Sequence, residues 1–181
     1  MYNSEQVAKL IEELRAINEK ELDLWLKYQA FTWQWWFSVT ISILPWVAWF
    51  IWRKKESTWR LLTVGFFIMI VSAYLDLLGQ IKFLWYYPIK TIPTIPPFFP
   101  WDFAILPVVT MFCVQIKPKL NPFIKAAGYS LSGAFIFQPF MIWIGLYTEV
   151  SWRHIYSVPI LFAMYMISHL IFYRKNYKGF E

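Results

Sequence analysis

The chain has 181 residues, a formal net charge of +6 and a mean hydropathy of +0.42, with 59% hydrophobic but only 15% charged residues. Soluble domains carry about 25% charged and 45–50% apolar residues, so the composition excludes an ordinary water-soluble domain. Its 22% aromatic content excludes a disordered chain. Cys113 is the single cysteine, which excludes an internal disulfide framework and a cysteine-based zinc site. What remains is an integral membrane protein.

The first segment of the chain, residues 1–34, predicts an amphipathic helix over about residues 4–30. Apolar residues recur there at alternating spacings of three and four, the heptad pattern, which Glu21 interrupts. One interpretation places this helix on the membrane surface with Trp25 and Tyr28 dipped into it. The other makes it an arm that docks a partner or a second copy. The apolar positions are Val7, Leu10, Leu14, Ile17, Leu24 and Tyr28, with Ile11, Leu22 and Trp25 widening the face.

Five apolar stretches follow, and a membrane span needs roughly 20 such residues to cross ~30 Å of hydrocarbon. The third is short, and all are too long for the ~10-residue alternating strands of a membrane barrel. The predicted fold is therefore all-α, a polytopic membrane helix bundle of five transmembrane helices over residues 35–175, with a cytoplasmic tail at 176–181. The stretches are 35–52, 59–79, 101–116, 123–147 and 155–173.

The distribution of basic residues predicts the orientation of these spans. Lysine and arginine collect after the first, third and fifth stretches, which places the amino terminus outside and the carboxyl terminus in the cytoplasm. Since topology accounts for the net charge, no nucleic-acid partner is expected. The expected partners are membrane lipids and either further copies of the chain or another membrane subunit. The basic residues are Arg53, Lys54, Lys55, Arg60, Lys117, Lys119, Lys125, Arg174, Lys175 and Lys178.

Prolines and small residues mark the interior of the spans. Pro45, Pro107, Pro139 and Pro159 each remove a backbone hydrogen bond. Ordinary kinks are favoured over broken helices that line a ligand site, because proline is common in membrane helices. A stripe of small residues in the fourth span predicts close helix packing. It consists of Ala126, Ser130 and Ala134.

The segment 81–100 carries five prolines and the sequence Trp85-Tyr86-Tyr87. Proline also disfavours helix at the residue before it, so this segment is predicted to be an extended cover packed on the outer mouth of the bundle. The aromatic triplet suits the headgroup layer.

Polar residues inside or near the spans are candidates for function, since they are costly in a membrane. Seven of them converge on the outer half and predict an outer-facing pocket that binds a ligand. Asp76 is the best single candidate because it lies deepest among the carboxylates. The alternative is simple hydration near the interface, with Asp102 capping its helix. The seven are Asp76, Gln80, Asp102, Gln138, Glu149, Arg153 and His154.

No cofactor, metal site or catalytic residue is assigned. His154 and His169 lie fifteen residues apart on one predicted helix, about 22 Å, so they cannot share one iron; His169 is expected to be structural. The leading hypothesis is a non-enzymatic protein that binds a ligand, a lipid or a partner. The alternatives are a small oligomeric transporter or channel with Asp76 as proton or cation site, and a lipid-modifying enzyme using Asp76, Asp102 or His154 as acid or base.

A set of short motifs in the second half of the chain resembles an uncharacterised family of small multi-pass membrane proteins from spore-forming Gram-positive bacteria. The resemblance covers about residues 60–175. The family has no established activity, so the resemblance implies a bacterial plasma membrane location and no site. The motifs are Pro100-Trp101-Asp102, Leu106-Pro107-Val108, Gln115, Lys117-Pro118, Asn121-Pro122, Pro139-Phe140, Trp143, Gly145-Leu146-Tyr147, Trp152, Tyr156-Ser157, Pro159 and His169.

Overall fold

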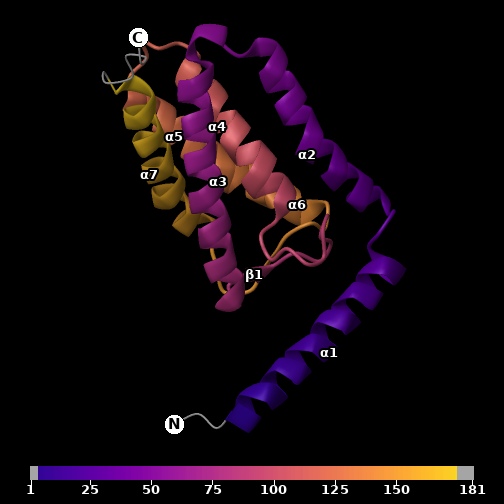
Figure 1. Cartoon of the computed structure of the whole chain (residues 1–181). Coiled ribbons are helices and arrows are strands. Elements are labelled where there is room, and N and C mark those ends of the chain that lie inside the picture. The colour runs from indigo at the N-terminus through magenta and orange to yellow at the C-terminus, as the bar shows by residue number, and fades with distance from the viewer. Residues whose placement is uncertain (1–3, 175–181) are drawn as a thin grey trace, which may run out of the picture.

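The computed structural model describes residues 4–174; the predicted tail at 176–181, with Lys175 and Lys178, lies outside them. The described chain is a helix bundle with one short two-stranded sheet, which confirms the all-α class (Figure 1). The elements are α1 (Ser4–Tyr28), α2 (Trp33–Trp52), η1 (Lys55–Ser57), α3 (Thr58–Ile81), β1 (Trp85–Tyr86), η2 (Trp101–Ile105), α4 (Leu106–Gln115), α5 (Pro122–Ser132), η3 (Gly133–Phe137), α6 (Gln138–Trp143), β2 (Thr148–Glu149) and α7 (His154–Tyr173).

Three helices in the described part of the chain are long and apolar enough to cross a membrane: α2, η1 with α3, and α7. The predicted third span is an apolar helix over Trp101–Gln115, which is shorter. The predicted fourth span is divided into α5, η3 and α6. The structure therefore supports three candidate spans, and the count of five stays a prediction.

The predicted fourth span also ends earlier than residue 147, because the chain turns at Gly145. This glycine has a φ of +77°, in the left-handed region that side chains disfavour. The amide of Leu146 donates to the carbonyl of Met141 (2.9 Å), and that of Gly145 to Ile142 (3.0 Å). This pair of bonds is the Schellman motif that ends many helices, so α6 stops at Trp143.

Two of the four helix prolines follow a π-helical turn. The turn η2 ends two residues before Pro107, and η3 ends two residues before Pro139. A π turn widens the helix locally and is often found at functional sites. Pro45 and Pro159 instead lie within α2 and α7. The sequence prediction of four ordinary kinks thus misses a difference between the two pairs.

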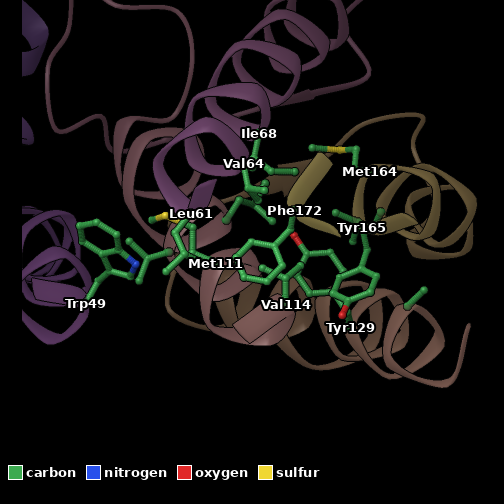
Figure 2. Close-up of a cluster of buried hydrophobic side chains, with 14 residues drawn as sticks. Trp49, Leu61, Val64, Ile68, Met111, Val114, Tyr129, Met164, Tyr165 and Phe172 are labelled. Atoms are coloured by element: carbon green, nitrogen blue, oxygen red, sulfur yellow. The ribbon is translucent and has the colours of Figure 1, made fainter. Parts of the chain in front are cut away.

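The apolar core joins α3, α4, α5 and α7, with Trp49 of α2 at its edge (Figure 2). Leu61, Val64, Ile68 and Met111 are fully buried within it. The predicted small-residue stripe faces this core: Ala126, Ser130 and Ala134 are all fully buried. Since α5 packs chiefly on α7, the partner helix belongs to the same chain.

The helix α1 projects away from the bundle and contacts it at its carboxyl end (Figure 1). The indole N–H of Trp25 donates to the carbonyl of Lys90 (2.7 Å), and the amide of Lys90 donates to Gln29 (3.0 Å). Glu21, the residue that interrupts the heptad pattern, pairs with the ammonium of Lys90 (2.7 Å). The other apolar residues of α1 are exposed, as both interpretations of this helix require. Trp25, which one interpretation dips into the membrane surface, is instead partly buried against Lys90.

Reversing the charge of Glu21 should loosen the attachment of α1. In a Glu21→Lys variant, two ammonium groups would face each other. A partly exposed ion pair such as that of Glu21 and Lys90 contributes up to about 1 kcal/mol to the stability of the contact. We expect chymotrypsin to cleave after Phe31, exposed in the turn between α1 and α2, about five-fold faster. Glu12→Lys, on an exposed part of α1, is the matched control. The double variant Glu21→Lys/Lys90→Glu should restore slow cleavage; equal rates in all four proteins would contradict the assignment.

Candidate functional site

We call the end of the bundle that carries β1 and β2 the strand end. The strands pair antiparallel, with Trp85 opposite Glu149 and Tyr86 opposite Thr148. This pairing fastens the proline-rich segment 82–100 to the turn before α7. The segment packs on the end of the bundle, as predicted for a cover.

Asp76 of α3 holds this segment in place. Its carboxyl group is buried and receives four donors. The Trp85 indole and the Tyr87 hydroxyl both donate to Oδ1 (2.6 Å each). The amide of Phe98 (2.9 Å) and the Gln80 side chain (3.1 Å) donate to Oδ2. Asp76 therefore has the bonding pattern of an ionised anchor for the cover.

Tyr87 is one of the anchor's donors. Its ring stacks on Phe98, with centroids 4.6 Å apart. Burial, together with the negative charge of Asp76, raises the pKa of Tyr87 well above its usual value. The phenol therefore stays protonated and keeps donating to Asp76 throughout the physiological range.

A cavity of about 120 Å³ lies beneath this cover. It lies between α3, η2, α6 and α7, and Trp85, Tyr87 and Phe98 of the cover also line it. An apolar cavity of about 150 Å³ accepts benzene, so the space suits a small organic group. The lining residues are Ser72, Leu75, Asp76, Trp85, Tyr87, Phe98, Trp101, Asp102, Leu106, Gln138, Met141, Tyr147, Trp152, Ser157, Ile160, Leu161 and Met164.

Two acceptors in this lining lack a donor. Asp102 is 1% exposed, yet its Oδ2 has no hydrogen-bond partner in the described chain, and neither has Oε1 of Gln138. Each residue comes from or directly follows a π turn. A buried unpaired acceptor costs roughly 1–3 kcal/mol, and more when charged. The cavity therefore favours an occupant that brings hydrogen-bond donors.

The charge of the cavity points to the same kind of occupant. Asp76 and Asp102 are both buried, and both line this cavity. Two carboxylates that share one cavity repel unless a proton or another cation lies with them. Within residues 4–174, no lysine, arginine or histidine lines the cavity to neutralise them.

Aromatic rings form much of the remaining wall. Trp85 meets Trp152 edge to face (centroids 5.1 Å apart) and lies 6.4 Å from Tyr147. The Trp152 indole donates to Ser157 (2.9 Å), so its polar group is satisfied. Ring faces attract cations as well as apolar groups. A wall of rings beside two carboxyl groups is the environment that an organic ammonium ion requires.

The seven predicted site residues therefore separate into two groups. Asp76, Asp102 and Gln138 line one cavity, and Gln80 supports Asp76 and also donates to Pro96 (2.5 Å). Glu149 and His154 instead pair with each other in the turn before α7. Arg153 is exposed at the start of that helix.

The aromatic lining of the cavity was not predicted from the sequence. Trp85 and Tyr87 were expected in the headgroup layer, but both turn inward to Asp76. Tyr86, between them, is 51% exposed. This alternation is the two-residue period of a strand. It is the signal from which the inward direction of Trp85 and Tyr87 and the outward direction of Tyr86 could have been predicted.

The described residues contain no group of three histidine, cysteine, aspartate or glutamate side chains that could hold a metal. His169 lies against Tyr173 (centroids 4.4 Å apart), and its Nδ1 has no partner in the described chain. A structural histidine would be expected to bond a neighbouring backbone or hydroxyl group, and no such bond forms at this nitrogen within the described chain.

Comparison with known proteins finds no matching family model, no matching curated protein and no matching solved structure.

Proposed function

We propose that this protein is a membrane protein that binds a small organic ammonium ion in the cavity at the strand end. The observation that carries the proposal is the fully buried Asp102 carboxyl group, with one oxygen that no donor of the described chain reaches. An ammonium group would supply donors to Asp102 and Gln138 and offset the charge of the carboxyl pair. The aromatic wall would hold its alkyl part.

The proposed membrane placement has the strand end outside and the opposite end in the cytoplasm of a bacterium. Supporting this, the predicted cytoplasmic segments lie together. Gln115 accepts from the amide of Lys54 (3.2 Å) and donates to Trp52 (3.4 Å), and the ammonium of Lys125 donates to Ile116 (2.7 Å). Basic residues that share one end are typical of the cytoplasmic side. A ligand would then reach the cavity from the outer leaflet or from outside.

A transporter or channel using Asp76 has less support than a binding protein. Four donors occupy the Asp76 oxygens, so this carboxylate is already committed to the cover. Beyond the cavity, the bundle interior contains the apolar core of Leu61, Val64, Met111 and Val114, all fully buried, whose side chains offer no polar groups to a transported ion (Figure 2). The same saturation of Asp76 argues against an acid–base role in lipid chemistry.

The proposal predicts selective stabilisation by a small primary ammonium ion. With detergent-solubilised protein, millimolar n-butylammonium should raise the melting temperature, and n-butanol should not. Asp102→Asn should weaken n-butylammonium binding at least about ten-fold, since charge-assisted hydrogen bonds contribute ~1.5–3 kcal/mol.

The control for this experiment is Asp23→Asn, which removes one carboxylate from the exposed face of α1. It should bind n-butylammonium as the wild type does. The proposal fails if n-butanol stabilises equally well, or if Asp102→Asn binds n-butylammonium with unchanged affinity.

A further inference from the structure

A second cavity, of about 240 Å³, adjoins the first one. Trp101, Leu106 and Leu161 line both, so the two cavities meet at these three side chains. Its wall is almost entirely apolar, and the hydroxyl of Tyr129 is already bonded to Thr110 (2.9 Å). The remaining lining residues are Ile105, Val109, Cys113, Gly128, Ser132, Gly133 and Phe137.

The packing of the bundle explains why this cavity exists. α5 packs chiefly on α7, while α4 packs chiefly on α3, so these consecutive helices separate along part of their length. At Gly128, which is exposed, an added methyl group would meet nothing within 4 Å. Phe137 is also exposed, at 36%. The cavity therefore opens sideways between α4 on one side and α5 with η3 on the other, on a surface of the bundle lined with apolar side chains.

We infer that the ligand is an amphiphile, with an ammonium head in the polar cavity and one alkyl chain in the second cavity. This inference rests on the function proposed above, and adds the chain. The two cavities adjoin at Trp101, Leu106 and Leu161. The first offers unpaired acceptors and negative charge, and the second offers an almost entirely apolar lining. No single polar ion and no plain hydrocarbon would match both. An alkylammonium ion matches both cavities, because its charged head carries hydrogen-bond donors and its chain is apolar.

The side opening gives such a ligand a route. A molecule dissolved in the membrane can enter with its chain between α4 and α5 and its head directed to Asp102. The ligand need not pass through the cover, which Asp76 holds in place by hydrogen bonds. Entry from the lipid is thus compatible with a cover that stays in place.

The experiment compares n-octylammonium with n-butylammonium on the full chain in lipid nanodiscs. The wild type should bind n-octylammonium at least about ten-fold more tightly, because added methylene groups enter an apolar space. Gly128→Phe adds a ring at the exposed edge of the second cavity. It should abolish most of that difference while n-butylammonium binding is unchanged. Wild type and variant are compared in identical nanodiscs, so the partitioning of n-octylammonium into lipid affects both equally and does not contribute to the difference between them.

Different failures separate the two proposals. Equal loss of the chain-length difference in Gly128→Phe and in a second filling variant, Ser132→Leu, supports the inference. If both variants keep the wild-type preference for n-octylammonium, the chain lies elsewhere and the inference is overturned while the ammonium site stands. If n-butylammonium does not bind the wild type, the proposed function itself fails. If n-octanol binds as tightly as n-octylammonium, the cavity takes acyl chains alone and the inference is also overturned.

Discussion

Replacing Asp76 with asparagine should lower the melting temperature of the detergent-solubilised protein by roughly 6–12 °C. The buried carboxylate accepts from four donors, the side chains of Gln80, Trp85 and Tyr87 and the amide of Phe98. An asparagine side chain keeps one oxygen and turns an N–H₂ group toward two of those donors. Hydrogen bonds to charged groups contribute ~1.5–3 kcal/mol each. A total loss of about 3 kcal/mol corresponds to that temperature shift for a chain of this size.

Two other aspartates serve as controls for Asp76→Asn. Asp102→Asn removes a neighbouring carboxyl group whose Oδ2 has no donor partner in the described chain, so its stability cost should be smaller. Asp23→Asn lies on the exposed part of α1 and should be neutral. Thermal denaturation of the three variants in one detergent measures all of them. If Asp76→Asn melts within 2 °C of Asp23→Asn, by roughly the scale of 1 kcal/mol or less, Asp76 does not anchor the cover.

The role of Asp76 shows where sequence reasoning succeeds and where it stops. Its depth along the predicted span identifies it as the residue that most needs a partner. The partners themselves, Trp85, Tyr87 and Phe98, come from a proline-rich segment whose path the local pattern does not specify. Without them, a buried carboxylate resembles a ligand site. With them, it is a structural anchor, and the unpaired acceptor is Asp102.

The end of α2 and the start of α5 could be predicted from the sequence because these boundaries have local causes. Arg53 and Lys54 directly follow the end of α2. At the start of α5, the side chain of Asn121 accepts from the amide of Phe123 (2.9 Å), and Pro122 takes the first helical position. The π turns have no such local signal. A proline two residues beyond the turn is compatible with a kink as well as with a π turn, and neighbouring helices decide between them. Asp102 lies in one of these turns and Gln138 directly follows the other. The positions of these two side chains in the site therefore could not be predicted from the sequence pattern.

The close approach of the cover to α3 gives the second large effect, at Gly79. A Cβ atom placed on Gly79 would lie 2.0 Å from Cζ2 of Trp85. The ring cannot shift freely, because its indole N–H is bonded to Asp76 and the ring meets Trp152 in an edge-to-face contact. Gly79→Ala should therefore cost about 2–4 kcal/mol: overpacking and a lost charge-assisted bond outweigh the ~1 kcal/mol that alanine gains in a helix. We expect a melting temperature lower by roughly 4–16 °C.

Gly128 offers the matched control for this substitution. It also lies in a helix, but its Cβ would meet nothing within 4 Å, so Gly128→Ala should be neutral or slightly stabilising. A double-mutant cycle then tests the cause. Trp85→Phe removes the ring atoms that collide, so Gly79→Ala should cost much less in that background. An equal cost of Gly79→Ala with Trp85 and with phenylalanine at this position would mean that the contact between α3 and the cover is not what requires glycine.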